Sequence, residues 1–101
     1  MALPGTVSKC SEIVAALTNT MACKSDVLRI NSTSSTTVLV TLTPPFGGQF
    51  SCVMYLVNSS GGAITTTTAG NFATTCSIPN NNMCEFVYSK SAAKWHCDKT
   101  T

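Results

Sequence analysis

Turn-forming residues interrupt this chain about every ten positions from Asp26 onward, which limits every intervening element to a few residues. The segments between the turns are rich in valine, threonine and aromatic residues, which favour β-strands. Helical periodicity is absent after residue 25. We therefore expect an all-β fold, a small antiparallel β-sandwich or barrel of about six to eight short strands. The interruptions fall at residues 44–48, 58–62, 69–71 and 79–82.

Two segments give the clearest strand signals. In residues 34–43, Val38, Val40 and Leu42 alternate with residues of the opposite face, which predicts one continuous strand ending at Pro44-Pro45. Residues 50–58 are apolar at both alternating sets of positions. This second pattern predicts a central strand covered on both sides.

The first 25 residues follow a different pattern. Residues 1–9 predict a loose arm, in which Leu3 and Pro4 are candidates for reaching a neighbouring molecule. Ile13 and Leu17 belong to a set of apolar residues at helical spacing, so a short helix or irregular coil is favoured there and a strand edge is the alternative. We divide the chain into an N-terminal arm and cysteine-clipped segment, residues 1–25, and a β domain, residues 26–101.

The 101 residues suffice for one domain. The charge of the chain limits the kinds of partner that it can bind. Charged residues make up only 10% of the chain, the net charge is +2, and the basic residues are scattered. Without a basic cluster, nucleic acid is a poor candidate partner. No apolar stretch approaches the length of a membrane span, so a membrane is not expected as a partner either.

Six cysteines in so short a chain predict a disulfide framework, with zinc binding and buried thiols as the alternatives. If Lys90-Ser91 forms a tight turn, Cys84 lies opposite Cys97 in an antiparallel pair, close to disulfide geometry. Cys84–Cys97 is therefore the preferred bridge. Cys10–Cys23 could then clip the N-terminal segment, which leaves Cys52 and Cys76 to link two strands.

Catalytic patterns are absent from the sequence. The four carboxylates, at Glu12, Asp26, Glu85 and Asp98, are not paired, and general acid–base catalysis needs such neighbours. His96 is the sole histidine, and in a strand it points away from its neighbour Cys97. We predict no enzymatic activity, no catalytic residue, no cofactor and no metal site.

Residues 64–76, ITTTTAGNFATTC, combine a threonine run with a turn signal. The threonines predict a strand, and Gly70 and Asn71 are the residues best suited to positive φ in a tight turn. Phe72 is then expected to re-enter the core. The other large aromatic residues are also assigned mainly to the core: Phe50, Tyr55, Phe86, Tyr88 and Trp95.

The order of several motifs resembles a module of small bacteriophage structural proteins. The motifs are LVTLTPPFGGQF, TTTTAGNFA and FVYSKSAAKW, which together span roughly residues 37 to 96. In that module an Asp-Gly turn stands where this chain has SKSAA, and an aromatic-proline ending stands in place of His96-Cys97.

The resemblance implies a virion protein of the capsid decoration or cement type. Such a protein would be made in the host cytoplasm, bind the outer face of the major capsid protein shell and stabilise the joints between subunits, often as a homo-oligomer, with a trimer favoured. Many copies would add avidity to modest individual contacts. Two alternatives are a phage tail-fibre or receptor-binding module and a secreted disulfide-rich binding domain.

Overall fold

The computed structural model describes residues 10–33 and 36–97 and confirms the expected all-β fold. The described residues form ten short strands and one 3₁₀ segment, more strands than the sequence predicted, and no sheet closes into a barrel. The elements are β1 (Glu12–Leu17), β2 (Thr20–Ala22), β3 (Val27–Thr33), β4 (Val38–Leu39), β5 (Thr41–Thr43), η1 (Pro45–Gly48), β6 (Cys52–Asn58), β7 (Ile64–Thr66), β8 (Ser77–Ile78), β9 (Asn82–Ser89) and β10 (Lys94–Cys97).

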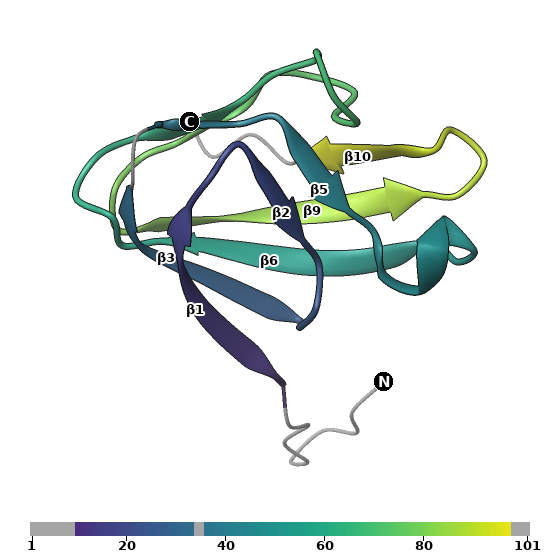
Figure 1. Ribbon diagram of the computed structural model, residues 1–101, viewed down its shortest axis with the longest axis horizontal. Helices are drawn as coiled ribbons and strands as arrows, with labels where there is room; N and C mark the ends of the chain where they lie inside the picture. Colours follow the sequence, from purple (N-terminus) through teal and green to yellow (C-terminus); the bar gives the residue numbers. More distant parts are fainter. Residues whose placement is uncertain (1–9, 34–35, 98–101) are drawn as a thin grey trace.

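The strands form two layers around one core. The first layer is a five-stranded sheet in the order β1-β3-β6-β9-β10. The second consists of two small sheets, β2-β5 and β4-β7-β8, and Figure 1 shows β2 and β5 crossing the large sheet. Side chains from both layers meet in a single buried cluster, which includes Leu28, Ile30, Leu39, Leu42, Met54, Leu56, Ile64, Phe72, Ile78, Phe86 and Trp95.

The pairing differs in part from the expected antiparallel sandwich, because four of the described strand pairs are parallel. They are β1–β3, β3–β6, β2–β5 and β4–β7, whereas β6–β9, β7–β8 and β9–β10 are antiparallel. Parallel neighbours need a crossover connection. Here the crossover is made by strands of the other layer, since the chain passes from β1 through β2 to β3, and from β3 through β4 and β5 to β6.

The N-terminal segment is a pair of strands and not the favoured helix. β1 pairs with β3 in the large sheet, and β2 pairs with β5 in the opposite layer. Leu17 reaches the core by ordinary strand alternation with the partly buried Ala15, because the register shift between Ala15 and Ala16 leaves the extra residue, Asn31, on β3. Residues 12–22 therefore pair with strands of the segment expected to form the β domain, residues 26–101. Leu3 and Pro4 lie outside the described residues.

The predicted continuous strand over residues 34–43 is broken at Val40. Leu39 and Leu42 are both fully buried, which strict alternation would forbid. The backbone N–H groups of Val40 and Thr41 both donate to the Asn19 carbonyl, at 2.8 and 3.0 Å. This shared acceptor marks the point where the chain leaves the β4-β7-β8 sheet for the β2-β5 sheet.

The turn before Phe72 has the expected position but a different cause. Gly70 and Asn71 lie in a turn over residues 68–71, and neither has a positive φ. A Cβ on Gly70 would overlap the carbonyl oxygen of Val40 and lie 2.6 Å from Thr41 Oγ1. Glycine is required here because two backbone segments approach closely, not because φ is positive.

The β9–β10 hairpin has a longer loop than predicted, and this changes the disulfide. Lys94 lies opposite Ser89, because Ala93 adopts φ 55° and its N–H donates to the Ser89 carbonyl at 2.8 Å. Cys97 consequently lies opposite Phe86 and not opposite Cys84. The predicted Cys84–Cys97 bridge is wrong.

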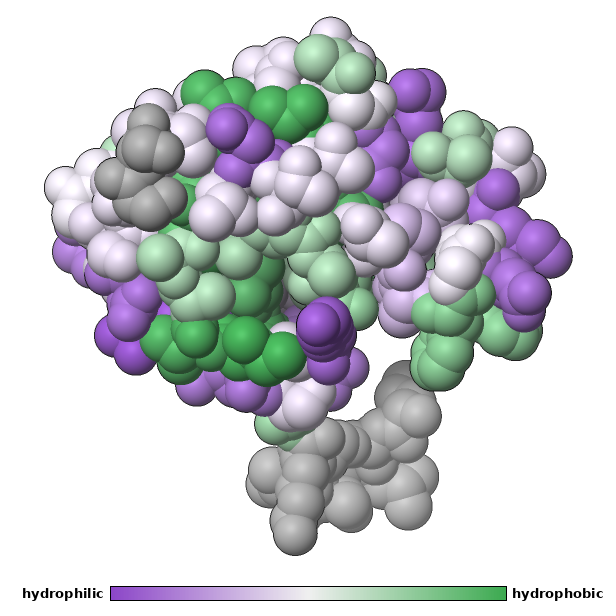
Figure 2. Space-filling model, in the orientation of Figure 1, coloured by the Kyte–Doolittle hydropathy of each residue, from purple (hydrophilic) through white to green (hydrophobic). Residues whose placement is uncertain are grey.

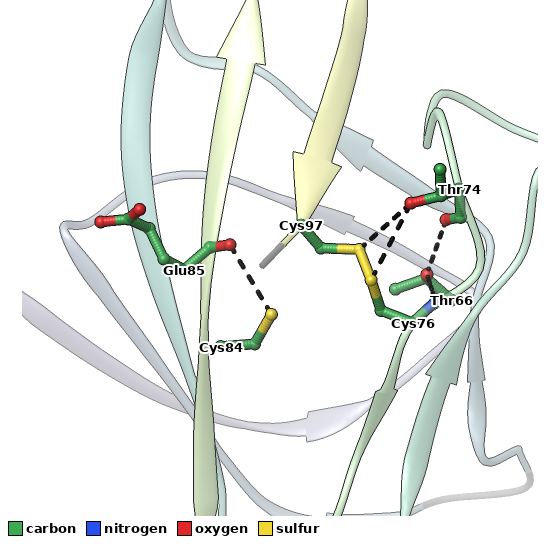
Figure 3. The surroundings of a disulfide bond; sticks show 6 residues. All are labelled: Thr66, Thr74, Cys76, Cys84, Glu85 and Cys97. Atoms are coloured by element: carbon green, nitrogen blue, oxygen red, sulfur yellow. Dashed lines mark hydrogen bonds between the residues drawn. A yellow bond between two sulfur atoms is a disulfide. The ribbon is translucent and has the colours of Figure 1, made fainter. Parts of the chain in front are cut away.

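The disulfide that forms joins Cys76 and Cys97, with Cα atoms 6.6 Å apart (Figure 3). It connects the segment leading into β8 with the end of β10, and so ties the two layers together. Thr66 Oγ1 accepts from the Cys76 N–H at 2.9 Å and donates to the Thr74 carbonyl at 3.2 Å. The predicted Cys10–Cys23 and Cys52–Cys76 bridges are absent, and the Cys84 thiol donates to the Glu85 carbonyl at 3.6 Å.

Candidate functional site

The side of the five-stranded sheet that faces away from the core is the most distinctive surface of the molecule, and we call it the outer face. Its centre is β6, where Val53, Tyr55 and Val57 alternate with the buried Met54, Leu56 and Asn58. Register places the outer-face residues of the neighbouring strands beside them. These neighbours are Glu12 and Val14 on β1, Val27 and Arg29 on β3, Met83, Glu85 and Val87 on β9, and Lys94 and His96 on β10.

The outer face exposes several large apolar side chains. Val53 is 47% exposed and Met83 51%, and Val87, which lies opposite Val53, is 38% exposed. Val14 and Tyr55 are exposed as well. The prediction that the β6 segment is covered on both sides is therefore wrong within this chain, since only its inner side meets the core. Clustered apolar residues of this kind mark interaction surfaces, whereas singly scattered ones do not.

Charges on the outer face are few and balanced. Glu12 and Glu85 supply two carboxylates, and Arg29 and Lys94 supply two cations. The Tyr55 hydroxyl donates to Glu85 Oε2 at 2.9 Å, and this hydrogen bond raises the pKa of Tyr55 above 10.0. Arg29 Nε donates to Ser59 Oγ at 3.0 Å. The surface thus combines an apolar centre with charges of both signs.

A groove lies at one end of the sandwich, between the loop after β2 and the segment that follows β5. It has a volume of about 630 Å³ and is lined by residues that include Cys23, Lys24, Pro44, Phe46 and Cys52. Figure 2 shows the indentation between these two segments, and a hydrophobic strip over β1 on the same side. Asp26 closes the end of the groove, where its Oδ2 accepts from the Ser11 N–H at 3.1 Å.

The titratable residues considered in the sequence are dispersed over the fold. Glu12 and Glu85 lie on different strands of the outer face, Asp26 holds the start of β3, and His96 is exposed on β10. In the described ranges, no group of three or more histidine, cysteine and carboxylate side chains could hold a metal ion. Over the same ranges, no helix is long and apolar enough to cross a membrane.

The aromatic residues divide into a buried and an exposed set. Phe72, Phe86, Tyr88 and Trp95 are buried as predicted, with ring centroids 5.2–6.5 Å apart in contacting pairs. Tyr55 and Phe50 are not core residues: Tyr55 lies on the outer face, and Phe50 is 60% exposed beside Phe46.

Two buried polar residues escaped the sequence analysis. Asn58 is fully buried, and its amide donates to the carbonyls of Gly62 and Ile78 while its Oδ1 accepts from Ser60. Thr66 is also buried beside the disulfide. The sequence indicated a turn after Asn58. The burial of Asn58 could not be predicted, because it depends on β6 occupying the centre of the sheet.

No protein family model matches this chain, and no curated protein and no solved structure matches it significantly.

Proposed function

We propose that this chain is a structural protein of a bacteriophage virion, a decoration or cement protein that binds the outside of the capsid. The observation that carries the proposal is the outer face, a five-stranded sheet surface that exposes a cluster of large apolar side chains on both sides of the Tyr55–Glu85 pair. Val53, Val87 and Met83 lie on adjacent strands there and are each more than a third exposed. Burying such a surface against a partner is favourable at about 25 cal/mol per Å² of apolar area.

The chemistry of the outer face favours a protein partner. Two carboxylates and two cations leave it without a net charge, so it lacks the basic patch that a polyanion would need. Protein interfaces combine an apolar core with a polar rim. A complementary partner would therefore present a largely apolar patch with charges of both signs at its edge. We propose that this partner is the major capsid protein.

The mechanism is mechanical. Each copy would cover a joint between capsid subunits, and assembly as a homotrimer would let several weak contacts act together. The disulfide between Cys76 and Cys97 would keep the two layers joined in a particle exposed outside the cell. The oligomeric state can be measured by analytical ultracentrifugation, where a trimer has three times the 10.6 kDa chain mass.

Cryo-electron microscopy of the virus particle that carries this chain tests the proposal. We expect density for the chain at regular positions on the outside of the shell, with the outer face against the capsid. A few copies confined to the tail would contradict a decoration role.

A binding assay on capsids stripped of the protein tests the surface itself. Val53→Glu places a charge at the apolar centre and should weaken co-sedimentation with capsids by about tenfold or more. Phe50→Glu is the matched control, because Phe50 is exposed and apolar but lies outside the outer face. Equal binding by both variants would refute the proposed contact surface.

A receptor-binding module is the second candidate, and one observation favours it. Phe46 and Phe50 are 76% and 60% exposed and meet edge to face with centroids 6.0 Å apart. Large aromatic side chains dominate the energetics of interfaces, so this exposed pair is a candidate contact for a receptor. Under this alternative, Phe50→Glu and not Val53→Glu would abolish attachment of the particle to host cells.

A further inference from the structure

Two cysteines outside the Cys76–Cys97 disulfide face the same groove from opposite layers. Cys23 follows β2, and its N–H extends the β2–β5 ladder by donating to the Thr43 carbonyl at 2.8 Å. Cys52 is the first residue of β6 and lies on the same side of the strand as the inward-facing Met54 and Leu56. Both residues line the groove at the end of the sandwich.

The two cysteines also pack against the same buried cluster. Cys23 is buried in the core cluster, and Cys52 is partly buried and packs against that cluster. Cys52 lies opposite the buried Tyr88, which places it at the inner surface of the large sheet. The Cys23 thiol donates to the Ser25 carbonyl at 3.7 Å.

We propose that Cys23 and Cys52 are a dithiol site that oxidises to a second disulfide between the layers. With a low-molecular-weight disulfide as oxidant, the more accessible Cys52 thiolate attacks one of its sulfur atoms and releases one thiol. The Cys23 thiolate then attacks the Cys52 sulfur of the mixed disulfide and releases the second thiol. Two protein thiols and one small disulfide thus become one protein disulfide and two small thiols, with all electrons and protons balanced.

The electrostatics of the site agree with this order of events. Burial raises the pKa of Cys23, and the neighbouring Cys52 raises it further, while burial alone raises the pKa of Cys52. Only the thiolate is nucleophilic, so both thiols react slowly at neutral pH and faster as the pH rises. The second bridge is therefore expected to form after folding, upon prolonged exposure to oxidising surroundings.

The second bridge would complete the covalent links between the layers. The Cys76–Cys97 bond joins β10 to the β4-β7-β8 sheet, whereas within the described part of the chain no disulfide joins the β2-β5 sheet to the large sheet. A Cys23–Cys52 bond would supply it. Closing the loop between Cys23 and Cys52 should raise the melting temperature by on the order of 10 °C.

Peptide mapping of the full chain tests the proposal. The protein is incubated at alkaline pH with glutathione disulfide, alkylated, and digested with trypsin and chymotrypsin. Phe50 and Tyr55 bracket Cys52 and separate it from Cys76 and Cys84. We expect a peptide containing Cys52 linked to one containing Cys23. Alkylation of both thiols, a stable glutathione adduct on Cys52, or linkage of either cysteine to Cys10 would overturn the proposal.

Variants provide the matched comparison. Cys10→Ser should keep the new cross-link and the rise in melting temperature, because Cys10 is exposed and does not line the groove. Cys52→Ala should lose both. If Cys52→Ala does not fold, the peptide map of Cys10→Ser still decides the pairing, because Cys10 and Cys23 share one tryptic peptide in the unaltered chain. A cross-link that leaves the melting temperature unchanged would overturn the inferred link between layers.

Discussion

The side chain of Asn71 hydrogen-bonds to both backbone polar groups of Leu42. Its Nδ2 donates to the Leu42 carbonyl at 2.6 Å, and its Oδ1 accepts from the Leu42 N–H at 3.0 Å. The Asn71 carbonyl in turn accepts from the backbone N–H of Trp95 at 2.8 Å, and the Trp95 indole donates to the Leu42 carbonyl at 2.7 Å. Asn71 thus takes the place of a strand residue beside β5 and joins it to β10 in the opposite layer.

Replacing Asn71 with alanine should destabilise the fold by about 2 kcal/mol. The change removes both hydrogen bonds and leaves the N–H of the buried Leu42 without this acceptor, and an unsatisfied buried donor is costly. Urea unfolding followed by circular dichroism measures the loss. Asn82→Ala is the control, because exposed Asn82 makes only a local contact to the Asn80 carbonyl and should change stability by less than about 0.5 kcal/mol. Similar losses in both variants would contradict the special role of Asn71.

Gly70→Ala should destabilise the protein far more than Gly62→Ala. A Cβ at residue 70 would overlap the Val40 carbonyl, a backbone group that cannot rotate away, so we expect a loss of roughly 3 kcal/mol or an insoluble product. At Gly62 nothing lies within 4 Å of the added Cβ, and φ is not positive. Thermal unfolding of the two variants makes the comparison. Matching melting temperatures would show that the Gly70 backbone can shift.

Reduction of the Cys76–Cys97 disulfide should lower the melting temperature by more than about 10 °C. The bond closes a loop with a sequence separation of 21, which corresponds to roughly 3 kcal/mol of stabilisation. Scanning calorimetry with and without a phosphine reductant gives the value. Cys97→Ala should melt at the same temperature with and without the reductant. For this comparison the other cysteines of the variant must be free thiols at the start. A reductant effect that persists in this variant would assign the stabilisation to another bridge.

The Tyr55 hydroxyl should ionise above pH 10.0, because it donates a hydrogen bond to the Glu85 carboxylate and tyrosinate could not. Its raised pKa means that the folded state holds this proton more tightly than the unfolded state. The resulting stability is present below the ordinary tyrosine pKa and is lost as the pH rises through the Tyr55 pKa.

Nuclear magnetic resonance of ring-labelled tyrosine resolves Tyr55 from the only other tyrosine, Tyr88. In Glu85→Gln the pKa of Tyr55 should return toward its ordinary value. An unchanged Tyr55 titration in Glu85→Gln would rule out the carboxylate as the cause.

Much of the strand content was predictable, but the N-terminal strands and the outer face were not. Residues 52–58 and 82–89 carry local signals for strands, namely alternating or continuous apolar residues bounded by turns. Ile13 and Leu17 suggested a helix because residues four positions apart share one face in a strand as well as in a helix. The exposure of Val53 could not be predicted, since it depends on the second layer covering only one side of β6.

Local residue preferences set where strands are possible and where the chain must turn, because they arise from each residue's own backbone and side-chain sterics. Which distant groups meet depends instead on how the two layers pack. Asn71 hydrogen-bonds to Leu42, which is 29 positions away in the sequence. Cys97 bonds to Cys76 because Ala93 lengthens the β9–β10 hairpin loop and shifts the register by two residues. Such choices rest on the packing of two layers around one core, in which a small change in register selects a different partner for every residue along the strand.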